Sequence, residues 1–223
     1  MEDRLIISVH FPKAAGTSLA EGLQAHFGTG LLRDYGTDPV DPLHPRHIAP
    51  HLYPMEPAQP PSAVRAVHGH FHINKYSSVG DAYRITFLRE PVENLISIYY
   101  FWRKYQNDNG HATFQLFKKL SPSLFEFAEF PAIKRLMSQT YFGDVQMSGF
   151  DFIGFYDRRD RDLARLGDLL GIAFDPEIYV NRTSDDERDS RDSIMNDRKA
   201  IDRLRRSLAE DCAFYDRVQQ MWG

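Results

Sequence analysis

The stretch Phe11–Leu19, FPKAAGTSL, follows the apolar run LIISVH directly and holds residues suited to binding an anion. A tight turn from a strand into a helix presents unpaired backbone N–H groups and the positive end of the helix dipole. Lys13 adds a positive charge, and the residues after it are small or carry hydroxyl donors: Ala14, Ala15, Gly16, Thr17 and Ser18. The lysine precedes the glycine, so the pattern G-x-x-x-x-G-K-[ST] is not matched, and the stretch predicts a site that is only phosphate-loop-like. The alternative is an ordinary strand, turn and helix with a solvated lysine.

A second anion site is predicted by RITFLREPVENLISIYYF. This segment places Arg89 at the carboxyl end of a strand, Pro91 at the start of a helix, and Ser97 about two turns into it. An arginine fork is the preferred partner of a phosphate dianion, and a serine hydroxyl can add one bond. The alternative for Arg89 is an ion pair with Glu90 or Glu93. Two anion sites on neighbouring strand ends would suit a ligand with two separated anionic groups.

The segment VHGHF, Val67–Phe71, offers candidates for a general base. His68 and His70 flank Gly69 at the end of a predicted strand, and strand alternation places both side chains on one face. Histidine suits proton transfer because its pKa is near neutral. At least one residue among these two and His72 is expected to make structural hydrogen bonds only.

A metal site is the rival interpretation of the histidines, because HPRHIAPH lies upstream of them. His44, His47 and His51 have no carboxylate between them, which favours solvated or structural histidines. The single cysteine, Cys212, excludes an internal disulfide and a cysteine-rich zinc site. No metal is predicted, and a reducing, cytoplasmic compartment is the simplest interpretation.

Apolar runs rich in β-branched residues alternate along the chain with segments of helical period. The predicted strands are Leu5–Phe11, Val64–Phe71, Tyr83–Leu88 and Phe150–Tyr156. The predicted helices are Thr17–Phe27, Val92–Lys104, Ser123–Phe142, Asp160–Leu170 and Ser193–Met221. This alternation predicts an α/β fold of three layers, in which a central parallel sheet is covered by helices on both faces.

Two segments lack such periodicity. Tyr35–Ser62 holds most of the chain's 13 prolines and is predicted to be a long loop or insertion. Thr183–Asp192, TSDDERDSRD, is too charged for a core and is predicted to be a mobile or ligand-ordered loop.

Length and charge limit the classes of function. The chain has 223 residues, of which 42% are hydrophobic, and this favours one domain over residues 1–223. The net charge of −4 argues against broad attraction to nucleic acid or to an anionic membrane. MEDRLIISV has no basic segment before its short apolar one, and no apolar run approaches about 18 residues, so neither a targeting segment nor a membrane span is expected.

The motifs PKAAGTSL and ITFLREPVENLISIYYF together resemble those of the PAPS-dependent sulfotransferases. In that family the first loop holds the 5′-phosphosulfate of 3′-phosphoadenosine-5′-phosphosulfate (PAPS), and an arginine and a serine hold its 3′-phosphate. VHGHF is similar to the HGH segment of the uronosyl 2-O-sulfotransferases of glycosaminoglycan synthesis. FDFIGFYDR, VNRTSD and EDCAFYDRV occur in the same order as comparable segments there. One departure is Ala14, where many relatives carry threonine or serine.

The resemblance implies an enzyme that moves the sulfuryl group of PAPS to a hydroxyl of an acceptor, with a carbohydrate favoured and no metal required. The PAPS-binding residues that it implies are Lys13, Ala15, Gly16, Thr17, Ser18, Arg89, Ser97, Arg182 and Thr183. Lys13 would also stabilise charge on the leaving oxygen. The base candidates, in order, are His70, His68 and His72, followed by Glu90 and Glu93. The acceptor is expected near Tyr35–Ser62 and Tyr99–Tyr105, because loops over strand ends line such sites.

Two other classes of function share these features. A small-molecule kinase would use the same anion loop but needs a carboxylate at a strand end to hold Mg²⁺, and Asp157 is the obvious candidate. A non-catalytic module that binds a nucleotide or a sulfated glycan would also explain the anion sites. Turnover with PAPS in the presence of a chelator would separate the three.

Overall fold

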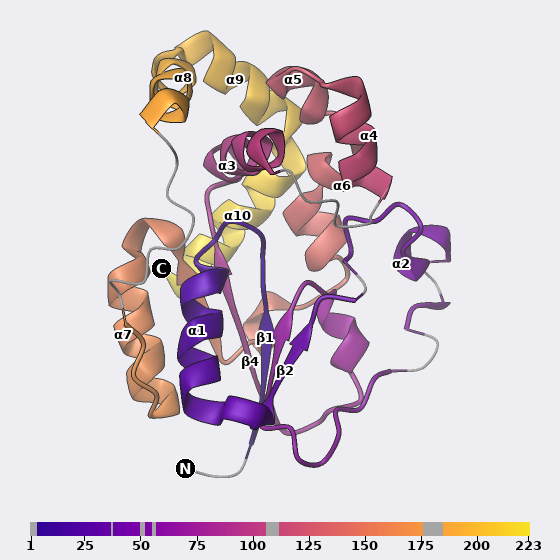
Figure 1. Ribbon diagram of the computed structural model, residues 1–223, viewed down its shortest axis with the longest axis vertical. Coiled ribbons are helices and arrows are strands. Elements are labelled where there is room, and N and C mark those ends of the chain that lie inside the picture. The colour runs from indigo at the N-terminus through magenta and orange to yellow at the C-terminus, as the bar shows by residue number, and fades with distance from the viewer. Residues whose placement is uncertain (1–3, 37, 50–51, 55–56, 106–111, 176–184) are drawn as a thin grey trace.

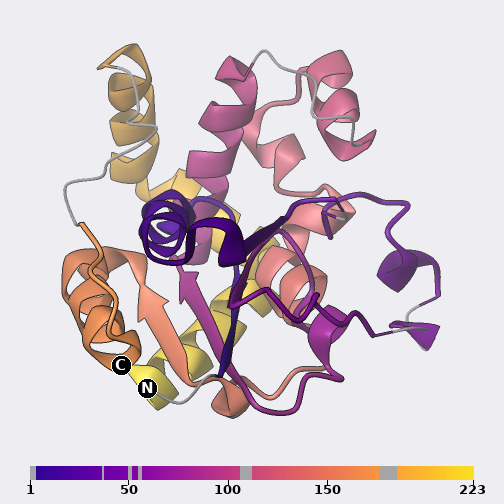
Figure 2. The ribbon, with the colours of Figure 1, turned by 60° about the horizontal axis from the view of Figure 1, so that its bottom comes forward.

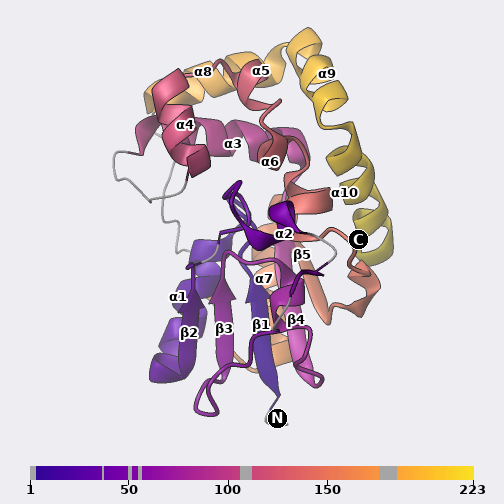
Figure 3. The ribbon, with the colours of Figure 1, turned by 90° about the vertical axis from the view of Figure 1, so that its right-hand side faces the viewer.

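A five-stranded parallel sheet forms the centre of the computed structural model, which describes residues 4–36, 38–49, 52–54, 57–105, 112–175 and 185–223. The strands are β1 (Leu5–Val9), β2 (Leu31–Asp34), β3 (Ala66–Gly69), β4 (Ala82–Leu88) and β5 (Phe152–Phe155). Their order is β2-β3-β1-β4-β5, and every pairing is parallel, so all the carboxyl ends lie at one edge (Figure 3). The predicted parallel sheet of an α/β fold is confirmed.

The four predicted strands are present, with slightly different ends, because their apolar runs are buried on both faces of the sheet. The strand β2 was not predicted. Its sequence, LLRD, is short and only half-buried at the edge of the sheet, so it has no continuous apolar run to signal it.

Helices cover both faces of the sheet, as predicted for three layers (Figures 1 and 2). On β5, the Phe152 ring lies beside Arg165 of α7 (Arg159–Leu170), whereas the Phe155 ring packs against Tyr215 of α10 (Ala209–Trp222). Because neighbouring strand positions alternate in direction, α7 and α10 lie on opposite faces. The helix α1 (Gly16–Phe27) lies on the α7 side, where Phe174 approaches glycines of both helices.

A second group of helices gathers beyond the carboxyl ends of the strands (Figure 3). It consists of α3 (Pro91–Lys104), α4 (Ala112–Leu120), α5 (Leu124–Phe127), α8 (Asp185–Asn196) and α9 (Arg198–Ser207). Trp102, Phe117 and Phe127 are buried there, with ring centroids 5.0–5.4 Å apart. These rings fix the direction in which α3 leaves β4.

Two predicted helices are wrong in extent. The segment predicted as Ser123–Phe142 is divided into α5, α6 (Pro131–Lys134) and a π-helix, η4 (Leu136–Tyr141). Its periodic apolar residues belong to separate short elements, and Pro131 starts a new one. The segment predicted as Ser193–Met221 is divided because Asp197 caps the start of α9 and a further break occurs at Leu208.

The charged segment predicted as the loop Thr183–Asp192 is also corrected. Thr183 lies outside the described residues, and from Asp185 the backbone forms α8. High charge keeps a segment out of the core, but it does not prevent an exposed helix, since Glu and Arg are good helix formers.

Within the described part of residues 35–62, the longest element is the single turn α2 (Pro45–Ile48), in agreement with the predicted loop. The remaining elements are 3₁₀ turns: η1 (Gly28–Gly30), η3 (Ile73–Tyr76), η5 (Met147–Gly149) and η6 (Tyr156–Arg158). No helix in the described part of the chain combines the length and apolar character needed to cross a membrane.

Candidate active site

The loop between β1 and α1 has an unusual backbone. Lys13 and Ala15 both adopt positive φ angles, of 58° and 74°. The left-handed region costs a residue with a Cβ about 1–2 kcal/mol, and residues held there cluster at ligand sites. The loop therefore maintains a shape that its residues would not adopt by themselves.

This shape leaves the first turn of α1 open. Ala15 occupies the N-cap position and has no polar side chain with which to cap the helix. The first helical bond within the turn runs from the Leu19 N–H to the Ala15 carbonyl, at 3.3 Å. The backbone N–H groups of Gly16 and Thr17 come before it, where a helix provides no backbone acceptor, so they can serve an anion.

The helix α3 holds the loop in place. Arg89, just before α3, donates from Nη1 to the Lys13 carbonyl at 3.3 Å, and Asn94 donates from Nδ2 to the Pro12 carbonyl at 2.7 Å. Both donors are buried. Because β1 and β4 are neighbours in the sheet, these contacts join the two predicted anion sites into one.

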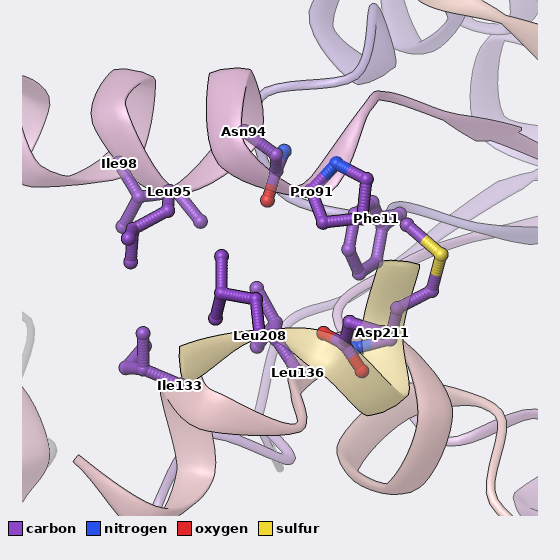
Figure 4. Close-up of a pocket in the computed structure, with 10 residues that line it drawn as sticks. Phe11, Pro91, Asn94, Leu95, Ile98, Ile133, Leu136, Leu208 and Asp211 are labelled. Atoms are coloured by element: carbon purple, nitrogen blue, oxygen red, sulfur yellow. The ribbon is translucent and has the colours of Figure 1, made fainter. Parts of the chain in front are cut away.

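Phe11 anchors the other side of the loop in an apolar pocket (Figure 4). The pocket is lined by side chains of α3, of the segment 133–137 and of the start of α10, among them Leu95, Ile98, Leu136 and Leu208. Its free space is about 10 Å³, which is about what one water molecule needs. The pocket therefore packs the loop and is too small to bind a substrate.

Arg89 is 4% exposed and has several partners besides Lys13. Its Nη2 donates to Glu93 at 3.4 Å, and its guanidinium lies 4.0 Å from the centroid of the Tyr156 ring. Its buried Nε has no hydrogen-bond partner among the described residues. Burial lowers the pKa of Arg89 and the charge of Arg191 adds to this, while Tyr156 and Glu93 act in the opposite direction. The ion pair with Glu93 and an unsatisfied donor are thus both present.

One face of α3 runs along the loop. Glu93, Ser97 and Phe101 follow at four-residue steps and therefore lie on the same side of the helix. Glu93 contacts Arg89 at one end of this row, and the Phe101 ring lies 4.4 Å from the Lys13 Nζ at the other. Ser97 is half-buried between them. The predicted residues Arg89, Ser97 and Lys13 are therefore brought together.

A cluster of three histidines lies on the other side of β1. The His10 ring stacks between those of His68 and His70, with centroids 5.0 and 4.4 Å away. His68 and His70 thus lie on one face, as strand alternation predicted. Gly69, between them, lies so close to the Asp34 backbone of β2 that a Cβ would overlap with it.

His10 links this cluster to the loop between β1 and α1. A Cβ at Gly16 would overlap with the His10 imidazole, so glycine is needed at the start of α1. The His10 Nδ1 and the Tyr35 hydroxyl are 3.0 Å apart. Burial lowers the pKa of His10 well below its ordinary value, and His70 and Lys13 add to this effect. His10 is therefore neutral at physiological pH.

His68 is completely buried, and its Nδ1 lies 2.8 Å from the Ser8 hydroxyl. Its Nε2 has no partner with hydrogen-bond geometry in the described part of the chain. Burial lowers the pKa of His68 well below the ordinary value, with further lowering by His10 and Arg33, while the Gly16 backbone acts in the opposite direction.

His70 is half-buried at the end of β3, and its Nδ1 lies 2.7 Å from the Tyr141 hydroxyl. Tyr141 in turn donates to the Asp38 carboxylate at 3.3 Å. Tyr35 also faces the His70 ring, with centroids 5.1 Å apart, and is 40% exposed. Of the three histidines predicted as base candidates, His70 is the least buried.

Three further histidines named in the sequence analysis, His72, His44 and His47, have structural contacts, and His51 lies outside the described residues. His72 is buried, accepts from the Asn74 N–H through Nδ1, and has its Nε2 3.1 Å from the Gly143 carbonyl. Burial lowers its pKa to about 3. His44 accepts from the Arg46 N–H, and the His47 Nε2 lies 2.7 Å from the Pro39 carbonyl. Among the described residues, no group of histidine, cysteine or carboxylate side chains is arranged to hold a metal ion.

Carboxylates near the strand ends have partners of their own. Glu90 accepts from the Glu93 N–H as the N-cap of α3, and burial raises the pKa of Glu90. Asp34, which ends the unpredicted strand β2, is bonded by Lys75 at 2.6 Å and by Tyr76 at 2.9 Å. Arg182 and Thr183, predicted to close over the nucleotide, lie outside the described residues.

An acceptor could reach only the exposed part of the region predicted to bind it. Tyr99, Tyr100 and Trp102 are buried in the core of the helical layer, whereas Tyr35 is exposed beside the histidine cluster. The run Tyr99–Tyr105 therefore serves mainly to pack α3 against its neighbours.

His10 and Tyr141 were not predicted as site residues, whereas Tyr35 and Asp38 lie in the predicted acceptor segment Tyr35–Ser62 but were not singled out. His10 directly follows a predicted apolar strand, and its position at a strand end was an available signal. Tyr141 and Asp38 carried no such signal, since both depend on contacts between distant segments.

No family model matches the chain, and no curated protein matches it. Among solved structures, mouse sulfotransferase SULT7A1 complexed with PAP is similar over 86% of this chain and 63% of that chain, with 17% identity and a TM-score of 0.38. A sulfotransferase from Alicyclobacillus acidocaldarius is similar over 92% and 96%, with 15% identity and a TM-score of 0.37. Retinol dehydratase in complex with androsterone and inactive cofactor PAP is similar over 88% and 65%, with 14% identity and a TM-score of 0.31. The chain thus spans less than two thirds of the first and third of these proteins.

Proposed function

We propose that the chain is a sulfotransferase that moves the sulfuryl group of PAPS to a hydroxyl of an acceptor, with a carbohydrate as the favoured class. One observation carries the proposal: the open β1–α1 loop lies between Arg89 on one side and the stacked histidines His10 and His70 on the other. This arrangement supports an anion site adjacent to a candidate base. A single core supports treating residues 1–223 as one domain, and the lone Cys212 supports a cytoplasmic location.

The residues of the anion site fit a ligand with two anionic groups. The unsatisfied Nε of Arg89 and the nearby charge of Arg191 would both be compensated by a phosphate dianion. Ser97, on the same face of α3, would add a hydroxyl. The N–H groups of Gly16 and Thr17 would bind the 5′-phosphosulfate, as the open helix end allows.

The chemistry needs a base, an in-line acceptor and stabilisation of the leaving group. PAPS supplies the sulfuryl group and leaves as adenosine 3′,5′-bisphosphate. His70 takes the proton of the acceptor hydroxyl, whose oxygen forms the new bond to sulfur as the bond from sulfur to the phosphate oxygen breaks. Lys13 and the N–H groups around Gly16 stabilise the charge that develops on the phosphate oxygen.

The acceptor would approach over Tyr35, which is exposed beside His70 and His10. A carbohydrate is favoured by the similarity of VHGHF to the HGH segment, and an aliphatic hydroxyl needs a positioned base more than a phenol does.

The test is transfer of label from ³⁵S-labelled PAPS to a panel of glycans, phenols and sterols, with a chelator present throughout. Label transfer to a glycan with release of adenosine 3′,5′-bisphosphate is the expected result. Transfer to phenols or sterols alone would refute the carbohydrate class. Nucleotide binding without any transfer would favour a binding module. In a parallel assay with Mg²⁺ and without the chelator, phosphoryl transfer from ATP would favour a kinase.

A further inference from the structure

We infer that Tyr141 and Asp38 are positioning residues that hold His70 in the tautomer with its proton on Nδ1, so that Nε2 carries the lone pair. This inference deepens the proposed function and rests on it for its catalytic meaning. Its structural content, the tautomer of one histidine, can be measured without any turnover.

The direction of the hydrogen bonds follows from the donors and acceptors available. An ionised carboxylate can only accept, so the 3.3 Å contact between the Tyr141 hydroxyl and the Asp38 Oδ1 is a hydrogen bond only when the single hydroxyl proton of Tyr141 points to Asp38. The Tyr141 oxygen is then left with lone pairs toward the His70 Nδ1, 2.7 Å away. Two lone pairs cannot form a hydrogen bond with each other, so the His70 Nδ1 must carry a proton and donate it.

Asp38 is fixed in the orientation that this arrangement requires. Its Oδ1 also accepts from the Val40 N–H at 3.0 Å, within the short turn that follows β2. The same oxygen thus receives two donors, one from the backbone and one from Tyr141. This local bond makes Asp38 an acceptor whose position is set by the chain around it and does not depend on the ligand.

Tyr141 is held equally firmly. It is completely buried and ends the π-helix η4, a type of element found frequently at functional sites. The start of η4 is capped by Asp211 of α10, whose carboxylate accepts from the Met137 N–H at 2.9 Å and from the Ser138 N–H at 2.8 Å. The Tyr141 ring packs edge-on against Phe11 of the anion loop. Burial raises the pKa of Tyr141 well above 10, with Asp38 adding to the effect, so its hydroxyl keeps its proton.

This arrangement would matter for proton transfer. When the His70 Nε2 takes a proton, the ring becomes a cation, and its Nδ1–H bond to the hydroxyl is strengthened by the negative charge of Asp38 beyond it. His10 and Tyr35 are titratable groups that also face the ring. His10 is held neutral by burial, whereas Tyr141 connects the His70 ring to the negative charge of Asp38.

The direct test is the tautomer of His70, measured by long-range ¹H–¹⁵N correlation spectra of ¹⁵N-labelled protein at a pH where the ring is neutral. The His70 signals are assigned by their loss in His70→Gln. The expected spectrum has a protonated Nδ1 and an unprotonated Nε2. In Tyr141→Phe, the population should shift toward the Nε2–H form. A protonated Nε2 in the unmodified protein, or an unchanged tautomer in Tyr141→Phe, would overturn the inference.

Tyr35→Phe is the matched control. It removes a hydroxyl from the other tyrosine that faces His70, but that hydroxyl bonds His10. The His70 tautomer should therefore not change in Tyr35→Phe, and an equal shift in both variants would contradict a specific role for Tyr141. Asp38→Ala provides a second variant outside the buried core. Tyr141 can then donate to the His70 Nδ1, so the Nε2–H form should increase, and no increase would remove Asp38 from the scheme.

Kinetics connect the tautomer to catalysis. Tyr141→Phe should lower kcat about 10- to 100-fold while the KM for PAPS stays within about twofold, a loss typical of groups that orient a reacting residue. A shifted tautomer with unchanged kcat on the true acceptor would show that the pair does not assist catalysis. An Nδ1–H tautomer that depends on Tyr141, in a protein that transfers no sulfuryl group, would refute the proposed function and leave the structural inference standing.

Discussion

Replacing Arg89 by alanine separates two roles that this residue has in the structure. Its guanidinium donates to the Lys13 carbonyl and so holds the loop, and its unsatisfied buried Nε is available to a phosphate. We predict that Arg89→Ala loses the ability to distinguish adenosine 3′,5′-bisphosphate from adenosine 5′-phosphate. The second nucleotide lacks the 3′-phosphate that Arg89 would bind.

The magnitude follows from the free energy of one charge-assisted hydrogen bond. Such a bond contributes about 1.5–3 kcal/mol, so its loss should weaken the bisphosphate about 10- to 100-fold. At a ligand concentration of 100 times the original Kd, binding stabilises the unmodified protein by about 2.7 kcal/mol, or roughly 5–10 °C in Tm. The same concentration should stabilise Arg89→Ala by only about 0.4–1.4 kcal/mol.

Thermal unfolding with each nucleotide is the assay, and Asn94→Ala is the matched control. Asn94 also donates to a carbonyl of the loop, that of Pro12, but it carries no charge for a phosphate. Both variants should therefore lower the Tm of the protein without ligand, while Asn94→Ala should still distinguish the two nucleotides. Equal Tm shifts for both nucleotides in the unmodified protein would refute the reasoning, as would discrimination that survives in Arg89→Ala.

Three further predictions concern the loop and the buried histidines. Lys13→Ala should lower kcat more than it weakens nucleotide binding, since its charge matters most as the leaving oxygen becomes negative; weaker binding with unchanged kcat would contradict this. Gly16→Ala should destabilise the protein by about 1–3 kcal/mol because the new methyl group overlaps with His10, whereas Gly80→Ala, with open space around it, should change the Tm little. His72 has its pKa lowered to about 3 by burial, so it contributes stability that is present above its unfolded-state pKa of about 6.5 and is lost as the pH falls toward 3. His72→Gln should therefore reduce the slope of unfolding free energy against pH between about 4 and 6 by about 1.4 kcal/mol per pH unit, and an unchanged slope in denaturant titrations would refute this.

The elements of the fold that the sequence determined are those with strong local signals. The segments that form β1, β3, β4 and β5 are apolar enough to be buried on both sides, and their composition alone predicts this burial. Pro91 likewise predicted the start of α3. The positions of Arg89 and His70 at strand ends follow directly from these local signals.

The ends of the longer helices were decided by tertiary contacts. The caps that divide the predicted helices come from Asp197 nearby and, for η4, from Asp211 on a different helix. Asp211 lies 74 positions from the Met137 N–H that it caps, so the periodicity of neither segment predicts this contact.

The candidate site itself shows the same division. The sequence determined that the loop predicted to bind an anion, an arginine and a histidine would each follow a strand, because each depends on the few residues around it. Only the tertiary structure stacked His10 between two other histidines and placed Tyr141 against His70, 71 positions earlier in the chain. These contacts depend on the order of the strands and on the packing of η4, and both arise from pairings across the whole chain that no local pattern specifies.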